Sequence, residues 1–317
     1  MIVTVTPNPA IDITYAVHEV TLGASHRVGS VHERAGGKGL NVAAVLTTMG
    51  RDSVAVAPVG RREIPFFDTD LQRRGIAHRL VESPCPTRRS IAVLDAAGEA
   101  TLFNESGAAQ PATVWQAVVQ VLASLSEPGS VLTISGSLPE QAPVDLVATL
   151  TGIGEDRGVP VVVDTAGAPL VAALSQRPTL VKPNRVEAES ATAALGRGAG
   201  GIAALLRILV DAGARAAVIS DGADGLHLLH EDVALHARLR EPLAGNPTGA
   251  GDALTAALAT ELETAGGLPQ GPEAWARALR RGGAWSAAAV LQPVAGAVDP
   301  ADIERLAAAV DVKESRR

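Results

Sequence analysis

A turn of small residues that leads into an alanine-rich segment is the part of this sequence best suited to chemistry. Gly249, Ala250 and Gly251 stand directly before Asp252, and residues 253–259 favour a helix. The free N–H groups and the positive dipole end at a helix start attract anions such as phosphate. A carboxylate among phosphate oxygens makes chemical sense if Asp252 takes a proton from an attacking hydroxyl. The alternative is that Asp252 caps the helix and the glycines allow close packing.

A second glycine turn, residues 35–41, also precedes an expected helix and reads Ala-Gly-Gly-Lys-Gly-Leu-Asn. It is not a P-loop, because Gly39 stands where that motif needs Ser or Thr, and His32 where it needs glycine. The dinucleotide-binding pattern G-x-G-x-x-G also fails, because Val42 occupies the last glycine position. The turn is therefore expected to hold a different ligand at the mouth of its helix. The residues expected to face that ligand are Gly37, Lys38 and Asn41.

Together, the two turns resemble the paired signatures of the PfkB (ribokinase-like) carbohydrate kinases. Four further segments are similar to the branch that contains 1-phosphofructokinases and tagatose-6-phosphate kinases: residues 1–15, 135–139, 180–187 and 246–247. These segments occur in the family's order and span nearly the whole chain. The resemblance implies transfer of a phosphoryl group from ATP to a hydroxyl of a sugar phosphate.

Composition limits the alternatives. The chain has 317 residues, 47% of them hydrophobic, so it can bury a large core as a single kinase domain covering residues 1–317. The net charge of −7 argues against nucleic acid or an anionic membrane as a partner. No apolar run reaches the roughly 18 residues that span a bilayer, and Met1 to Thr6 reads as a buried strand instead of a signal peptide. The single cysteine, Cys85, fits a reducing compartment, so a cytoplasmic location is expected.

Short β-branched runs alternate with helical stretches along the first two thirds of the chain. The expected strands are 2–6, 53–59, 131–135, 159–163, 179–181 and 216–220. The expected helices are 40–48, 64–74, 112–125, 144–150, 186–195 and 202–212. Such alternation predicts a three-layer α/β/α sandwich with a mostly parallel central sheet.

Two segments break this alternation. Residues 13–34 and 88–104, the latter with a turn at Asp95-Ala-Ala-Gly98, look like strands without a following helix. The family resemblance implies that they form a small β-strand lid. Exposed lid strands need covering, so a homodimer through the lids is a further expectation. The charged tail 313–317 is expected to fray.

The acceptor side is assigned from the resemblance. Asp12 is expected to accept hydrogen bonds from sugar hydroxyls, although a strand-end cap is an alternative. The acceptor's own phosphate needs cations, for which Lys38 and Arg88 are the main candidates and Arg27 or Arg89 further ones. Replacing Lys38 is accordingly expected to raise the KM for the sugar phosphate more than that for ATP. The complete substrate-binding set is Asp12, Gly37, Lys38, Asn41, Arg88, Asn104 and Ser137.

On the nucleotide side, Glu187 and, more remotely, Asp164 are expected to act on Mg²⁺ through water, because hard oxygens suit this ion. Asp221 is a departure from the family pattern, since an apolar residue is expected there. A second departure is the segment 61–65, where relatives often carry another glycine. The nucleotide-binding set is Lys182, Asn184, Ser220, Gly222, Gly225, Gly249 and Gly251.

The hypothesis is an ATP-dependent, Mg²⁺-requiring kinase with Asp252 as the base. Fructose 1-phosphate is the first acceptor considered, with tagatose 6-phosphate and fructose 6-phosphate as alternatives. A non-catalytic sugar-phosphate sensor and a kinase for an unphosphorylated alcohol are alternatives of other classes. Because an ordinary carboxylate is a weak base for an alcohol, positioning is expected to contribute more than a raised pKa.

Overall fold

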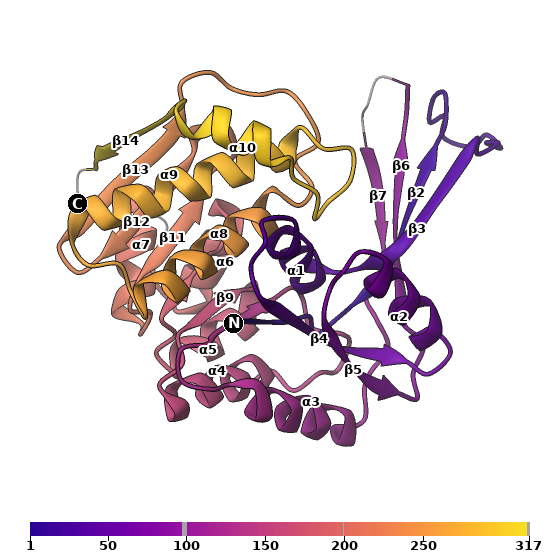
Figure 1. Ribbon diagram of the computed structural model, residues 1–317, viewed down its shortest axis with the longest axis horizontal. Helices are drawn as coiled ribbons and strands as arrows, with labels where there is room; N and C mark the ends of the chain where they lie inside the picture. Colours follow the sequence, from indigo (N-terminus) through magenta and orange to yellow (C-terminus); the bar gives the residue numbers. More distant parts are fainter. Residues whose placement is uncertain (97–99, 199, 316–317) are drawn as a thin grey trace.

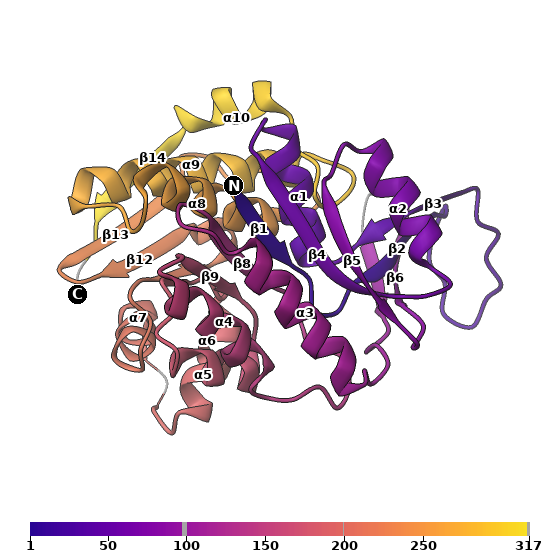
Figure 2. The same ribbon diagram turned by 60° about the horizontal axis from the view of Figure 1, so that its bottom comes forward.

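The computed structural model describes residues 1–96, 100–198 and 200–315. A ten-stranded sheet runs through the body of the molecule, and a four-stranded sheet projects from it (Figure 1). Helices cover both faces of the larger sheet (Figure 2). The expected three-layer α/β/α fold with a mostly parallel sheet is therefore confirmed. No helix in the described ranges is long and apolar enough to cross a lipid bilayer.

The larger sheet has the order β14-β13-β12-β11-β10-β9-β8-β1-β4-β5, and it is parallel from β5 to β11. Its parallel strands carry Val, Ile and Leu runs that are buried between two helical layers. The search for β-branched runs does not predict the edge strand β5, because polar residues surround Leu80 and Val81 in it. The parallel strands are β1 (Ile2–Val5), β4 (Ser53–Gly60), β5 (His78–Ser83), β8 (Val131–Ser135), β9 (Val161–Asp164), β10 (Leu180–Val181) and β11 (Ala217–Ser220).

The helices form two layers with separate hydrophobic clusters. One face of the sheet packs against α1 (Lys38–Thr48), α8 (Ala250–Ala265) and α9 (Gly271–Val290), and α10 (Pro300–Ala307) lies on α9. The other face packs against α3 (Ala112–Leu125), α4 (Leu146–Arg157), α5 (Gly167–Leu174), α6 (Arg185–Ala194) and α7 (Ile202–Asp211). α2 (Ile64–Arg73) packs beside β3, β4 and β5. The carboxyl ends of the parallel strands, where α/β proteins bind ligands, thus lie between α1 and α8 on one side and the small sheet on the other.

Three antiparallel strands extend the sheet beyond β11: β12 (Leu226–His230), β13 (Val233–Leu239) and β14 (Val310–Glu314). Their sequences mix apolar residues with His, Arg and Asp, so the search for apolar runs does not predict them. The expected frayed tail is corrected in part, because Lys313 and Glu314 pair with His236 and Leu235 of β13. Residues 316–317 lie outside the described part of the chain.

The small sheet has the order β3-β2-β6-β7 and consists of β2 (Ala10–Ala16), β3 (Ser30–Gly36), β6 (Arg88–Leu94) and β7 (Ala100–Asn104). These strands overlap the ranges from which a lid is expected. The register aligns four polar residues in one row across the sheet: Arg34, Asp12, Ser90 and Asn104. Part of the turn expected at 95–98 lies outside the described residues. One face of this sheet therefore carries a polar row, at the end of the sheet that joins the body.

Candidate active site

A single cavity of about 620 Å³ lies between the small sheet and the larger sheet. Both glycine turns line it, because α1 and α8 begin side by side at the carboxyl ends of the parallel strands. The expectation that the two turns share one cleft is met. The expected site residues that line the cavity are Asp12, Gly37, Lys38, Asn41, Arg88, Lys182, Asn184, Glu187, Ser220, Gly222, Gly225, Gly249, Ala250, Gly251 and Asp252.

The turn before α8 requires glycine at its first position. Gly249 is the N-cap and has a φ of +89°, which L side chains rarely adopt. A Cβ there would also lie 2.7 Å from the Cα of Ala295. The Asp252 side chain makes no capping hydrogen bond, so the interpretation of this residue as a helix cap is wrong. Its carboxylate is instead available to the cavity.

Asp252 is buried in the lining of the cavity and contacts the other turn. Asn41 Nδ2 donates a hydrogen bond of 2.8 Å to Asp252 Oδ2. Burial raises the pKa of Asp252 to about 7, with a smaller contribution from Asp164, while Lys38 and Asn41 act against this shift. A carboxyl group with a pKa near neutrality suits a general base at physiological pH. That positioning contributes more to catalysis than this raised pKa stays a prediction.

Two lysines meet at one carboxylate beside Asp252. Lys38 Nζ lies 3.3 Å from Asp164 Oδ1, and Lys182 Nζ lies 3.4 Å from the same oxygen. Asp164 is fully buried, and Thr255 Oγ1 donates to its Oδ2 at 3.0 Å. Burial alone would raise the pKa of Asp164, but the two lysines and the hydrogen bond from Thr255 hold it below its usual value. Asp164 therefore stays ionised and positions both ammonium groups.

The position of Lys38 differs from the expectation. Its ammonium contacts Asp164 and lies 3.6 Å from Glu187 Oε1, and Asp164 is the main reason that the pKa of Lys38 is raised. The charges that act on Asp12 come instead from Arg34, Arg88 and Arg74. The Lys38 ammonium thus lies with Asp164 and Glu187 and not with Asp12.

Glu187 is oriented by the start of its own helix. Asn184 caps α6 by accepting from the Glu187 N–H at 2.8 Å, and Glu187 Oε2 accepts from the Asn184 N–H at 2.8 Å. This capping box leaves Oε1 directed at the cavity. In the described ranges there is no group of three or more His, Cys, Asp or Glu residues that could enclose a metal ion. A single outward carboxylate oxygen suits Mg²⁺ that is held mainly by water and substrate phosphates, whereas Asp164 is already occupied by the lysines.

Asp12 and Arg88 form the other end of the cavity. Arg88 donates through Nε to the carbonyl of Asn8 at 3.2 Å and through Nη1 to that of Glu105 at 3.1 Å. Burial raises the pKa of Asp12 while Arg34 and Arg88 oppose the shift. Asp12 is the third residue of β2, so it is not a strand-end cap. This end of the cavity thus combines a hydrogen-bond acceptor for hydroxyls with fixed guanidinium groups.

The remaining expected acceptor residues lie beside the cavity or away from it. Asn104 Oδ1 accepts a hydrogen bond of 2.7 Å from Ser90 Oγ, and it is Ser90 that lines the cavity. The Ser137 hydroxyl accepts from Asn8 Nδ2 at 3.3 Å and is not part of the lining. Arg27 and Arg89 are exposed outside the cavity.

Membership of a protein family follows from a match between a family model and nearly the whole chain. Residues 5–302 match the family model described as pfkB family carbohydrate kinase. The protein belongs to the pfkB family. The chain is therefore an ATP-dependent carbohydrate kinase, and its family uses ATP as co-substrate. The two glycine turns that the sequence predicts are among the segments that line the cavity of this pfkB kinase.

Individual relatives of this pfkB kinase agree with the assignment. A 1-phosphofructokinase of Xanthomonas campestris pv. campestris is 38% identical over 268 residues, which are 82% of this chain and 83% of that protein. The structure of phosphofructokinase-2 from Escherichia coli in complex with fructose-6-phosphate is similar with a TM-score of 0.85, 25% identity, and coverage of 97% and 98% of the two chains. Ribokinase from Thermotoga maritima shares the fold with a TM-score of 0.74 at 18% identity, over 96% and 98% of the chains.

The nucleotide end of the cavity is lined by residues that the motif search missed. Pro242, Leu243 and Val290 supply apolar surface opposite Ser220, Gly222 and Gly225. Of these three residues, only Val290 lies in a segment that the sequence marks, because residues 286–291 are small and apolar. Asp221 is paired with Arg185 at 3.1 Å, which explains how a charge is accommodated where an apolar residue was expected. Arg61 likewise pairs with Glu82, and none of the residues 61–65 lines the cavity.

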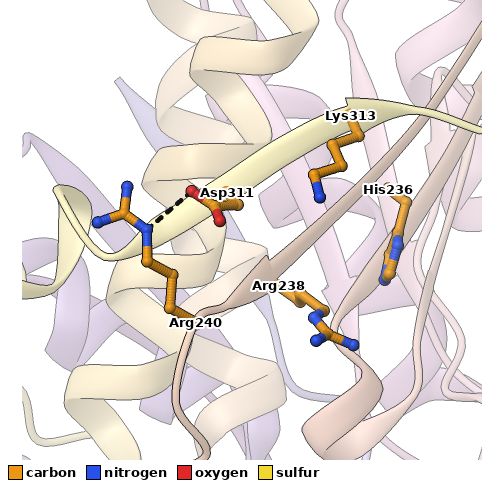
Figure 3. Close-up of a pocket in the computed structure, with 5 residues that line it drawn as sticks. All are labelled: His236, Arg238, Arg240, Asp311 and Lys313. Carbon is orange, nitrogen blue, oxygen red and sulfur yellow. Dashed lines mark hydrogen bonds and ion pairs between the residues drawn. The ribbon is translucent and has the colours of Figure 1, made fainter.

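A second hollow of about 410 Å³ lies on the outer face of β13 and β14 (Figure 3). Its lining is mostly basic and contains one carboxylate, Asp311, which accepts from Arg240 Nε at 3.0 Å. Asp311 is thus engaged by Arg240, and no glycine is among the lining residues. The residues of this hollow are His236, Arg238, Arg240, Asp311 and Lys313.

Proposed function

We propose that this pfkB kinase transfers the γ-phosphoryl group of ATP to a hydroxyl of a ketohexose phosphate, with fructose 1-phosphate converted to fructose 1,6-bisphosphate. The observation that carries the proposal is the place of Asp252. It lies between an end of the cavity with Asp12 and Arg88 and an end with two lysines and a glycine turn. The 38% identity to a 1-phosphofructokinase supports this acceptor.

At the acceptor end, Asp12 would accept hydrogen bonds from sugar hydroxyls, and Arg88 would bind the phosphate that the sugar already carries. An uncharged sugar would bring no anion to the Arg88 guanidinium, on which Asp12 and Glu105 already act. Asp252 would take the proton of the reacting hydroxyl as its oxygen attacks phosphorus. Its pKa of about 7 leaves a large fraction of the enzyme in the basic form near neutral pH.

At the phosphoryl end, the N–H groups of residues 249–251 would hold the γ-phosphate at the start of α8. Lys38 and Lys182, both held by Asp164, would neutralise charge on the transferring group. We therefore reassign Lys38 from the acceptor phosphate to the transferring phosphate. The Glu187 carboxylate would hold Mg²⁺ through water, and the ion would supply positive charge to the phosphates of ATP. Ser220, Gly222 and Gly225 would contact the nucleotide.

We further propose that residues 1–317 act as one catalytic unit in the cytoplasm, with the small sheet as its lid. The lid face opposite Asp12 carries a row of Ile13, Ile91 and Phe103, and Phe103 is 58% exposed. Val31 on the same face is 52% exposed. This surface would pair with the lid of a second copy. Light scattering of wild type and Phe103→Asp would test it, because a dimer should become a monomer.

A coupled spectrophotometric assay tests the proposed function. The values of kcat/KM are compared for fructose 1-phosphate, fructose 6-phosphate, tagatose 6-phosphate and ribose at fixed ATP and Mg²⁺. Fructose 1-phosphate should be the best acceptor and ribose the poorest, and Asp252→Asn should remove turnover with every acceptor. A different ketohexose phosphate with the highest value would correct the acceptor. Binding of sugar phosphates without any turnover would replace the kinase by a sensor.

A further inference from the structure

Arg34 connects the small sheet to the body of the molecule. It lies in β3 opposite Asp12 of β2, and its Nη2 donates a hydrogen bond to the carbonyl oxygen of Ala295. Ala295 belongs to the loop between α9 and α10 and lines the cavity, whereas Arg34 itself is not part of the lining. A side chain of the polar row is thus tied to a backbone atom of the cavity wall.

The loop that Arg34 holds packs against both parts of the phosphate-binding end. A Cβ added to Gly249 would lie 2.7 Å from Ala295 Cα and 3.0 Å from Gly296 N. A Cβ added to Gly296 would lie 2.9 Å from Asn41 Oδ1. These values show that residues 295–296 pack closely against the Gly249 turn and Asn41, so we expect a shift of residues 295–296 to disturb that packing. Asn41 in turn holds Asp252 by a hydrogen bond of 2.8 Å.

Several charges surround the Arg34 guanidinium. Burial is the main cause that lowers the pKa of Arg34, and the neighbouring Arg74 adds to it, while Asp12, Asp70 and Asp252 act in the opposite direction. Arg74 is fixed by Asp70 Oδ2 at 3.3 Å and by the carbonyl of Ala35 at 3.1 Å. Arg34 thus lies within electrostatic reach of both Asp12 and Asp252.

We propose that Arg34 is a positioning residue that couples sugar-phosphate binding at the lid to formation of the phosphate-binding turn and to the orientation of Asp252. The inference rests on the proposed function and adds a connection to it. Sugar phosphate that binds Asp12 fixes the lid row, Arg34 transmits this position to residues 295–296, and these set Gly249 and Asn41. Because coupling is reciprocal, each substrate tightens binding of the other.

Calorimetric binding of β,γ-methylene-ATP with and without saturating fructose 1-phosphate tests the connection without requiring turnover. Wild type should bind the analogue more tightly when the sugar phosphate is present, by a factor in the range of about 5- to 150-fold. Arg34→Ala should bring this factor close to 1 while the Kd of the analogue alone stays within about twofold. Arg34→Lys, which keeps a cationic donor, should restore part of the factor. Arg27→Ala, an exposed arginine that does not line the cavity, is the matched control and should behave as wild type.

Four results would overturn the proposal. If fructose 1-phosphate does not change the Kd of the ATP analogue in wild type, the two substrates are not coupled. Turnover of fructose 1-phosphate by the same protein would then still support the proposed function. If fructose 1-phosphate tightens binding of the ATP analogue to Arg34→Ala as much as to wild type, Arg34 takes no part in the coupling. A weaker Kd for fructose 1-phosphate alone, with the factor retained, makes Arg34 a ligand of the acceptor phosphate. Wild type that neither binds nor phosphorylates fructose 1-phosphate refutes the proposed acceptor together with this inference.

Discussion

Asn41 and Asp252 are 211 positions apart in the chain, yet a buried hydrogen bond of 2.8 Å joins Asn41 Nδ2 to Asp252 Oδ2. Asn41 lies in the first turn of α1 and Asp252 in the first turn of α8, so this contact fixes two helix starts against each other. It also leaves the second carboxylate oxygen of Asp252 available to a substrate. The base is therefore oriented before any substrate binds.

The pH dependence of turnover should report the titration of Asp252. A base must be unprotonated, so kcat/KM of wild type should fall about tenfold per pH unit below the pKa of about 7. Asp252→Asn should lower kcat by about 10²- to 10⁴-fold above pH 7, and this difference should shrink at lower pH as wild type loses its unprotonated base. Initial rates from pH 5 to 9 measure both effects. A flat profile through neutral pH would contradict the role of this carboxylate.

The same residue should make stability depend on pH. Burial raises the pKa of Asp252 in the folded state above its ordinary value of 3.8 to about 7, so the folded protein binds the proton more tightly than the unfolded chain. The contribution of this group to stability therefore falls as pH rises from about 4 to about 7. Asp252→Asn should show little gain in Tm at pH 4 and its full gain above pH 7. Scanning calorimetry of both proteins measures this difference, and a gain that shrinks as pH rises would refute the assigned environment.

Lys38 and Arg88 should separate the two substrates kinetically. Lys38 lies with Asp164 and Glu187, so Lys38→Ala should lower kcat by about 10²-fold or more and raise the KM for ATP more than that for the sugar phosphate. Arg88→Ala should instead raise mainly the KM for the sugar phosphate, because this guanidinium lies near Asp12. Steady-state kinetics with both substrates varied provides the comparison. The opposite pattern for Lys38→Ala would return this residue to the acceptor phosphate.

Gly249→Ala should damage the phosphate-binding turn through its backbone. The residue has a φ of +89° and its new Cβ would meet Ala295, so the turn must move. We expect a loss in kcat of about tenfold or more and a weaker Kd for the ATP analogue. Gly50→Ala is the matched control, because Gly50 has a φ of +65° but open space around its Cβ position. It should lower stability by about 1 kcal/mol and leave kcat unchanged; an equal loss of kcat in both variants would assign the effect to general destabilisation.

Much of the fold could be predicted because local patterns carry it. The β-branched runs and the helical stretches between them predict the parallel part of the sheet, since each such segment is buried on both faces or on one stripe. The strands β5, β12, β13 and β14 were missed for the opposite reason. Charged residues or histidines interrupt the apolar residues of these strands, so no continuous apolar run marks them. In such strands the sequence gives only a weak signal, and pairing with the neighbouring strands decides the conformation.

The chain itself determined the two glycine turns, the carboxylate that follows one of them and the lysine within the other, because glycine readily adopts the positive φ that Gly37 and Gly249 have. Tertiary structure alone decided where the charges point. Lys38 faces Asp164 and not Asp12, Asp252 has a raised pKa, and Arg34 reaches Ala295, 261 positions away. The physical reason is that pKa values and ion pairs depend on burial and on distances between side chains. Those distances are set by the packing of α1, α8 and the small sheet, and not by neighbours in the sequence.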